Sequence, residues 1–388
     1  MLTIIALLSL LIWCSLLFAR GRFWLADSAI ATPAAGHHSY PYSYPDLVAV
    51  VVPARNEAAV VGDCIGSLLR QTGIQAVHVF LVDDGSTDET AQTARTAALQ
   101  AGNEEALTII TGQPLPPGWS GKLWAVQQGV QAARAISPSF LLLTDADIAH
   151  APESLATLVS IARSGPFDLV SFMVKLHCSA VAEKFLIPAF VFFFFMLYPP
   201  RWISDQRRGT AGAAGGCILL RPEWLERAGG ISAIRNEIID DCALAKRVKA
   251  ADGRLWLGLT TSSASVRRYD TFTEVERMIS RTAFNQLGHS AWMLLGCILG
   301  LAITYLAPPL LLLSSHLTVR LTAGSAMLLM VAAYLPMVRF YRLNPLWALT
   351  LPLAALFYMG STLHSAWKFW SGRGGEWKGR IQDPAASG

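Results

Sequence analysis

Hydrophobic and polar positions divide the chain into three stretches. Residues 1–19 are nearly all apolar, and apolar residues dominate again from Ala291 almost to Trp367. Between them, from Leu47 to Arg163, short apolar runs of strand length alternate with segments in which apolar residues recur at helical spacing. The pattern predicts an α/β domain between an N-terminal and a C-terminal membrane region.

The middle stretch predicts strands and helices in alternation. Because helices separate the strands, we expect a mostly parallel sheet with helices on both faces. In such sheets, ligands bind at the carboxyl ends of the strands. The strands are expected at Leu47–Val52, Val77–Val82, Leu107–Ile110 and Phe140–Thr144, and the helices at Ala58–Arg70, Asp88–Gln100, Leu123–Ala135 and Pro152–Arg163.

The N-terminal apolar stretch has about the ~20 residues that a membrane crossing needs. A cleaved signal peptide is the alternative, but it requires positive charge before its apolar core, and here Arg20 and Arg22 come after it. Basic residues mark the cytoplasmic side of a crossing. We therefore expect an uncleaved anchor over residues 1–22, a Pro- and Tyr-rich linker over 23–45 and a cytoplasmic domain over 46–287.

The C-terminal region, residues 288–367, predicts spans near 291–313, 321–338 and 346–366, followed by a polar tail over 368–388. Arg339 and Arg342 indicate a cytoplasmic loop, and the basic residues of the tail indicate a cytoplasmic tail. Because only one predicted span separates this loop from the tail, the two cannot both be cytoplasmic if that span crosses the membrane. One of the three segments could instead be re-entrant or interfacial. The Phe-rich segment 185–198 is short for a span, so we expect a buried or interfacial helix there.

Composition agrees with this division. Hydrophobic residues make up 53% of the chain and charged residues 15%, against roughly 25% charged in an average soluble domain. The net charge of +4 is spread out, and no dense Lys/Arg block indicates nucleic acid as a partner. The six cysteines lack zinc-type or redox-type spacing, which favours free thiols in a reducing compartment.

Acidic side chains lie directly after the predicted strands. Asp145 and Asp147 come after the strand at Phe140–Thr144, and residues i and i+2 at a strand tip point to the same side. The pair could converge on one divalent cation, or form a turn with solvated acids. Asp83 and Asp84 come after another strand, where turn and capping chemistry explains the next three residues but not the doubled acid.

Two further elements carry charge at predicted helix starts. Lys122, in the segment Gly118–Lys122, is unfavourable for the helix dipole unless an anion binds there; the alternative is a solvated surface lysine. Asp240 and Asp241 open another helix, either as ordinary dipole complements or with a general base among them. The Gly/Ala-rich loop 209–216 suits the close approach of a ligand. We expect the lone histidines, among them His150, to be structural.

Taken in order, the elements at residues 53–57, 83–88, 118–122, 144–147 and 239–244 resemble a family 2 glycosyltransferase of the GT-A fold over about residues 46–285. The anchor and the later spans resemble the ceramide-glucosyltransferase-like branch, and in particular the bacterial hopanoid-associated glycosyltransferase group. The resemblance implies an inverting, membrane-bound enzyme of the bacterial inner membrane that moves sugar from a nucleotide-sugar donor, expected to be a UDP-sugar, to a lipid hydroxyl. Polyprenyl-phosphate and ceramide- or diacylglycerol-type acceptors remain open, as does a non-catalytic membrane scaffold.

The resemblance also implies roles for individual residues. Asp241 would be the general base, and Asp147, assisted by Asp145, would hold Mg²⁺ or Mn²⁺. The acceptor side would include Gly215, Gly216 and Asp240. The donor side would include Pro53, Arg55, Glu57, Asp83, Asp84, Lys122, Asp145 and Arg281.

One element departs from the family pattern. Many relatives carry a Q/RxxRW sequence after the base, and the segment Met278–Thr282 keeps its arginine, Arg281, but lacks the Gln/Arg and the Trp. The missing Trp argues against a processive polysaccharide synthase, whose polymer stacks on aromatic residues there. The details of acceptor binding therefore cannot be taken from the family pattern.

Overall fold

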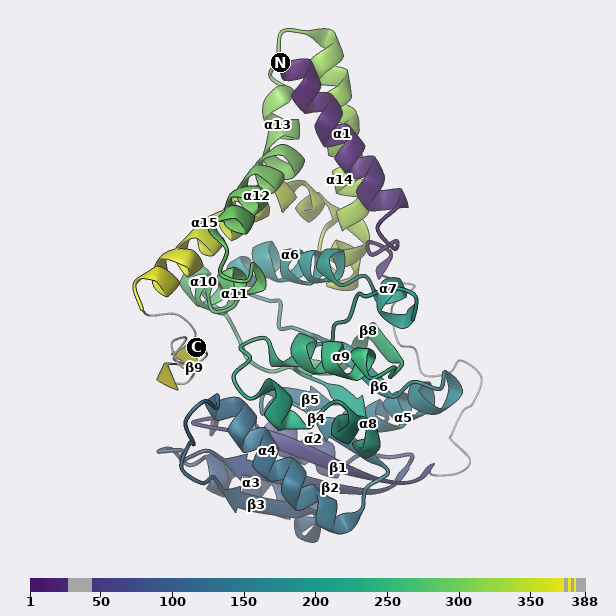
Figure 1. Cartoon of the computed structure of the whole chain (residues 1–388), viewed down its shortest axis with the longest axis vertical. Coiled ribbons are helices and arrows are strands. Elements are labelled where there is room, and N and C mark those ends of the chain that lie inside the picture. The colour runs from purple at the N-terminus through teal and green to yellow at the C-terminus, as the bar shows by residue number, and fades with distance from the viewer. Residues whose placement is uncertain (27–43, 373–375, 378–379, 382–388) are drawn as a thin grey trace. The chain divides into compact units, whose positions relative to one another are not determined.

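The computed structural model describes residues 1–26, 44–372, 376–377 and 380–381 (Figure 1). The described residues form two compact units. Unit 1 comprises the described residues of Met1–Ala29, Cys178–Trp202 and Arg268–Gly375, and unit 2 those of Ile30–His177, Ile203–Arg267 and Glu376–Gly388. Most of the expected linker 23–45 and much of the expected tail 368–388 lie outside the described residues.

Unit 2 is built on an eight-stranded sheet with strand order β3-β2-β1-β4-β7-β6-β8-β5. Neighbours β3, β2, β1 and β4 are parallel, whereas β7 runs antiparallel to β4 and β6, and β5 antiparallel to β8. The predicted mostly parallel α/β fold is confirmed. The strands are β1 Tyr44–Ala54, β2 Ile74–Asp83, β3 Leu107–Thr111, β4 Phe140–Leu143, β5 Ile148–His150, β6 Leu169–Lys175, β7 Ile218–Leu220 and β8 Leu255–Ser265.

Helices cover both faces of this sheet. Val48, Val50 and Val52 of β1 pack with α2, α3 and α5 in one apolar core, whereas alternate residues of a strand face the opposite side. On that side Val51 meets α4 so closely that a Cβ at Gly129 would lie 2.4 Å from its side chain. The helices of unit 2 include α2 Val61–Leu69, α3 Thr90–Ala101, α4 Gly121–Ala133, α5 Ser154–Ser164, α8 Pro222–Arg227 and α9 Asp240–Ala250.

The predicted elements up to residue 164 all exist, with shifts of a few residues at their ends. The pattern did not predict β5 to β8, which are short or lie beyond the regular alternation. The parallel register brings Ala54, Asp83 and Thr111 to one edge of the sheet, because Ala54 pairs with Asp83 and Asp83 with Thr111. The loops after β1 and β2 therefore begin side by side.

Unit 1 is helical. It holds α1 Leu2–Phe18 and α6 Val181–Leu197, and then α10 Phe272–Ser280, α11 Ala283–Gln286, α12 Ala291–Leu301, α13 Ala307–Leu311, α14 Leu317–Phe340 and α15 Leu351–Trp370. Segments Cys178–Trp202 and 268–287, which we expected inside the domain 46–287, thus cluster with these helices. All six cysteines lie in described residues of the two units and are free thiols.

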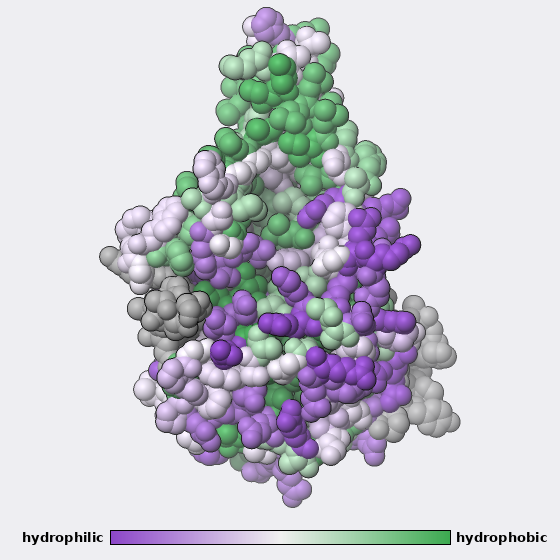
Figure 2. All heavy atoms as spheres, viewed as in Figure 1, coloured by the Kyte–Doolittle hydropathy of each residue, from purple (hydrophilic) through white to green (hydrophobic). Residues whose placement is uncertain are grey.

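Four helical stretches of the described chain are long and apolar enough to cross a membrane: Val181–Ser204, Ala291–Leu311, Leu317–Phe340 and Pro345–Trp370. The first contains the Phe-rich segment; it packs against α10, α14 and α15 and buries Phe192 and Phe195. Helix α1 is apolar but shorter. Figure 2 shows apolar residues over the exposed surfaces of α1, α13 and α14, where many leucines are exposed.

Candidate active site

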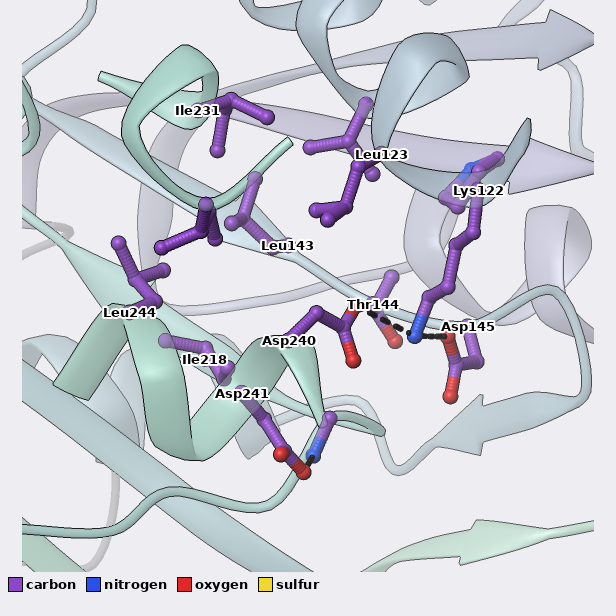
Figure 3. A pocket seen from close by; sticks show the side chains of 14 residues that line it. Lys122, Leu123, Leu143, Thr144, Asp145, Ile218, Ile231, Asp240, Asp241 and Leu244 are labelled. Atoms are coloured by element: carbon purple, nitrogen blue, oxygen red, sulfur yellow. Dashed lines mark hydrogen bonds and ion pairs between the residues drawn. The ribbon is translucent and has the colours of Figure 1, made fainter. Parts of the chain in front are cut away.

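A pocket in unit 2 gathers charged residues that are far apart in the sequence. They come from the start of α4, the loop after β4 and the start of α9, while the end of β1 and the Gly/Ala-rich loop contribute uncharged lining residues (Figure 3). Its remaining wall is apolar, with Leu123, Leu143 and Leu244 among the lining residues. Of the residues predicted to form a site, it contains Pro53, Lys122, Asp145, Gly215, Asp240 and Asp241.

Lys122 lies between two carboxylates. Its Nζ is 2.9 Å from Asp145 and 3.0 Å from Asp240, and Figure 3 shows the side chain extending from α4 toward both. Ser120 caps this helix by accepting a hydrogen bond from Leu123 N. Burial disfavours the charged ammonium, but Asp145 and Asp240 outweigh it and hold the pKa of Lys122 above its ordinary value. Lys122 is thus a partly buried cation of the pocket and not a solvated surface lysine.

Asp241 has the environment of a general base. Its Oδ2 accepts a hydrogen bond from Gly215 N at 2.8 Å, and its Oδ1 accepts one from Cys242 N at 2.7 Å, which fixes the carboxylate in the pocket. Burial, followed by the neighbouring Asp240, raises the pKa of Asp241 to about 6. A carboxylate with a pKa close to neutrality can take a proton and release it again at physiological pH.

The loops after β1 and β2 bind each other. Arg55 donates to the backbone carbonyl of Asp84 and lies 3.9 Å from its carboxylate. Asp83 Oδ1 accepts a hydrogen bond from Ser86 N at 2.8 Å, and Asn56 Oδ1 accepts one from Thr87 N at 2.8 Å. The negative charges of the two adjacent acids are thus stabilised, Asp84 by the basic Arg55 and Asp83 by the backbone N–H of Ser86.

Glu57 and Asp147 meet at a residue that sequence reasoning missed. Arg267 Nη2 is 2.7 Å from Glu57 Oε2, and its Nε is 3.2 Å from Asp147 Oδ2. Ser265 Oγ donates to the same Asp147 oxygen at 2.8 Å. The sequence does contain a feature that could have indicated Arg267: two adjacent arginines, Arg267 and Arg268, follow a strand closely, as the two adjacent acids do at the end of β2.

Asp145 and Asp147 do not lie on a strand tip. They occupy the connection between β4 and β5, and they face different cations, Lys122 and Arg267. Within the described residues no group of three or more His, Cys, Asp or Glu side chains is arranged to hold a metal ion. The donor chemistry nevertheless fits, because carboxylate oxygens are the ligands that Mg²⁺ prefers. An ion here would have to displace a basic side chain from at least one of the two acids.

The remaining predicted residues lie beside the pocket or outside unit 2. The carbonyl of Gly216 accepts a hydrogen bond from Thr144 Oγ1 at 2.7 Å. Arg281 belongs to unit 1, at the end of α10. His150 is buried, with its ring nitrogens 3.2 Å from Thr144 Oγ1 and 3.0 Å from Ser263 Oγ. Burial lowers the pKa of His150 to about 4, which confirms a neutral, structural histidine.

Part of the chain matches a known protein family and several characterised proteins. Residues 49–229 match the family model described as Glycosyl transferase family 2. An undecaprenyl-phosphate 4-deoxy-4-formamido-L-arabinose transferase of Pseudomonas aeruginosa is 32% identical over 134 residues, which is 33% of this chain and 35% of that protein. A 4,4'-diaponeurosporenoate glycosyltransferase of Staphylococcus aureus is 33% identical over 99 residues, which is 26% of this chain and 23% of that protein. The chain thus spans about a third or less of the length of these relatives.

A solved structure shows the same fold over nearly the whole chain. The mannosyltransferase PcManGT from Pyrobaculum calidifontis, in complex with GDP-Man and Mn²⁺, superimposes with a TM-score of 0.54 at 17% sequence identity. The match covers 95% of this chain and 99% of that one. Together with the family match, it confirms the predicted GT-A-like fold. Residues 49–229, the part of the chain that matches the Glycosyl transferase family 2 model, thus lie within a GT-A-like fold.

Proposed function

We propose that this chain is a membrane-bound, inverting glycosyltransferase that moves a sugar from a nucleotide-sugar donor to a lipid hydroxyl. The observation that carries the proposal is Asp241, a partly buried carboxylate with a pKa raised to about 6 in a pocket that also holds Lys122 and Asp145. Such a group suits the removal of a proton from an acceptor hydroxyl. The family 2 domain supports the reaction class.

In the proposed reaction, Asp241 accepts the proton of the acceptor hydroxyl while the hydroxyl oxygen attacks the anomeric carbon of the sugar. The new bond forms on the face opposite the departing nucleoside diphosphate, so the configuration inverts. The ammonium of Lys122 lies where it can bind the diphosphate. When bound, Mg²⁺ or Mn²⁺ at Asp147 and Asp145 would supply further neutralisation of the leaving diphosphate.

The other predicted residues divide between the two substrates. The loops after β1 and β2 would bind the donor, and the Gly/Ala-rich loop with the start of α9 would face the acceptor. On the donor side we place Pro53, Arg55, Glu57, Asp83, Asp84 and Arg281, and on the acceptor side Gly215, Gly216 and Asp240.

The charges of the pocket favour a hydroxyl acceptor. On the proposed acceptor side, Asp241 lies beside a second carboxylate, Asp240, which disfavours an acceptor that is itself an anion there, whereas the cation Lys122 is left to the diphosphate of the donor. A phosphate acceptor, moreover, is already ionised and needs no base. We therefore place a neutral lipid alcohol at Asp241. The resemblance to the hopanoid-associated group suggests a hopanoid or related polycyclic lipid.

Polyprenyl phosphate is the second candidate acceptor. The observation that favours it is the similarity to an undecaprenyl-phosphate sugar transferase, which extends over 33% of this chain. The two candidates differ in what they require of Asp241, because only the alcohol has a proton that must be removed. An acceptor comparison therefore separates them.

The proposed location is the bacterial inner membrane, with unit 2 facing the cytoplasm. Four helical stretches of the described chain have the length and composition of membrane spans. Arg20 and Arg22, directly after α1, favour a cytoplasmic position for the chain on their C-terminal side. A cytoplasmic domain has access to soluble nucleotide sugars.

The test is transfer by the purified full-length chain in lipid nanodiscs. UDP- and GDP-sugars are each offered with a hopanoid alcohol, a diacylglycerol, a ceramide and undecaprenyl phosphate, and products are identified by mass spectrometry. We expect a glycolipid of inverted configuration from an alcohol acceptor, formed at least about 100-fold more slowly by Asp241→Asn. Transfer to undecaprenyl phosphate alone would establish the second candidate. Absence of transfer from every donor, by a chain that is folded, would contradict the glycosyltransferase proposal.

A further inference from the structure

Arg267 joins two parts of the site that lie 90 residues apart in the sequence. Glu57 comes after β1, and Asp147 lies in the connection between β4 and β5; the guanidinium of Arg267, just after β8, contacts both. The three side chains are largely buried, with 32% of Arg267, 11% of Glu57 and 14% of Asp147 exposed to solvent. Charge pairs with this degree of burial are held more firmly than surface ion pairs.

The end of β8 fixes Asp147 through more than the guanidinium. Val266 N donates to the backbone carbonyl of Asp147 at 2.8 Å, and Ser265 Oγ donates to Asp147 Oδ2 at 2.8 Å. Arg267 Nε donates to that same oxygen at 3.2 Å. The carboxylate of Asp147 therefore has a fixed position and a resident positive neighbour.

A divalent cation that binds Asp147 must compete with this neighbour. A guanidinium leaves a carboxylate readily only when another anion takes its place, and a diphosphate offers two oxygens to its planar fork. The donor diphosphate therefore provides the replacement. Without it, the positive charge of Arg267 opposes a second cation at the same oxygen.

We propose that Arg267 is a positioning residue that makes divalent-cation binding at Asp147 depend on the diphosphate of the donor. This inference rests on the proposed function, since it assumes a nucleoside diphosphate and a metal ion in this site. Arg267 holds Glu57 and Asp147 together until the diphosphate arrives, and then turns its guanidinium to the phosphate oxygens. Metal ion and donor thus bind cooperatively, each raising the affinity for the other by the same factor.

The test measures Mn²⁺ binding to the full-length chain in detergent, by electron paramagnetic resonance of the free ion, with the affinity for UDP and GDP determined separately with and without Mn²⁺. In Arg267→Ala we expect Mn²⁺ alone to bind about tenfold more tightly than in the unchanged chain, because the competing charge is gone. The ratio of nucleotide affinities with and without Mn²⁺ should fall toward one. Arg267→Lys keeps the charge and serves if the alanine variant does not fold; it should retain weak Mn²⁺ binding while losing part of the nucleotide coupling.

Two further variants test whether the effect is specific to Arg267. Glu57→Gln removes the second partner of the guanidinium and should weaken Mn²⁺ binding, the opposite sign to Arg267→Ala. Arg268→Ala is the matched control, because Arg268 is the adjacent arginine, is well exposed and pairs at 3.8 Å with the exposed Asp270. Its Mn²⁺ affinity should not change.

The inference is overturned if Arg267→Ala and Arg268→Ala bind Mn²⁺ and nucleotide alike, or if neither they nor the unchanged chain bind Mn²⁺. If the unchanged chain transfers sugar while Arg267→Ala shows no change in coupling, the role of Arg267 is wrong and the proposed function stands. If the unchanged chain neither binds nucleotide nor transfers sugar, both are wrong.

Discussion

At the scale of single residues, the charge of the pocket is set by Lys122 and its acidic neighbours. Burial and Asp240 raise the pKa of Asp241, whereas Lys122 lowers it. Two opposing neighbours therefore adjust the pKa of Asp241, the proposed base, one on its own helix and one on α4. Removing either one should change the pH at which the enzyme works.

The first prediction concerns Asp241 itself. As a base it must be ionised, so kcat should fall as the pH drops through about 6, the raised pKa of this carboxyl. Asp241→Asn should lower kcat by about 10²–10⁴-fold, the usual contribution of general acid–base catalysis. Nucleotide-sugar affinity should stay nearly the same. A pH–rate profile and a donor titration check both points, and full transfer by the variant would contradict the assignment.

The second prediction concerns Lys122. Because its charge lowers the pKa of Asp241, Lys122→Met should move the acid limb of the pH–rate profile to higher pH. Donor affinity should also fall, since the cation beside Asp145 is lost. The control is Lys246→Met, an exposed lysine on the same helix as Asp241. An acid limb that stays in place in Lys122→Met would show that Lys122 does not act on the base.

At the scale of elements, an ion pair between the exposed Arg163 and the buried Asp46 joins α5 to the start of β1. Arg163 Nε and Nη2 bind the two oxygens of Asp46 at 3.0 and 2.7 Å, and Asp46 is 2% exposed. The pair lies far from the pocket, because Asp46 is near the beginning of β1, whereas the pocket residue Pro53 is near its carboxyl end. It stabilises the sheet on which the site is built.

The third prediction concerns the stability that this pair provides. Arg163→Met leaves the buried carboxylate of Asp46 without this partner. We expect the free energy of unfolding to fall by about 2–3 kcal/mol, less than for a fully buried pair because Arg163 is partly exposed. The thermal unfolding midpoint should fall by about 5–10 °C. Arg134→Met, which breaks an ion pair exposed on both sides, is the control and should change little. Equal midpoints in the two variants would contradict the structural role of the Asp46 pair.

At the scale of the whole molecule, the chain combines a GT-A-like α/β domain with apolar helices. Many large apolar side chains on α12 to α15 are exposed, Trp292 and Leu310 among them. Large exposed apolar surfaces are rare in soluble monomers and mark contact with a membrane or a partner. Candidate spans of 21 to 26 residues have the length for a bilayer crossing.

The fourth prediction is a membrane topology. The chain should stay in the membrane fraction after alkaline carbonate extraction. Protease should digest unit 2 in inverted inner-membrane vesicles and leave it intact in spheroplasts, because Arg20 and Arg22 favour a cytoplasmic domain. Digestion of unit 2 in spheroplasts, with a cytoplasmic marker protein intact, would contradict this orientation.

The α/β alternation, the apolar helices and most of the candidate site residues could be predicted from the amino-acid sequence alone. These features are local: apolar runs of strand length, helical spacing and acids at strand ends can each be recognised within a few residues. Alternation also predicted which ends of the strands carry the site. The same local signals identified Asp241 and Lys122 as candidates, each with an ordinary structural alternative.

Which of these charges contact one another could be seen only in the folded chain. Lys122 pairs with Asp145 and Asp240 because α4, the loop after β4 and α9 converge on one pocket. Asp145 and Asp147, close together in the sequence, separate toward different cations because the chain turns between β4 and β5. The partner of Asp147, Arg267, lies 120 residues later, just after β8. Ion pairs depend on distance in space, and a sequence records distance only along the chain.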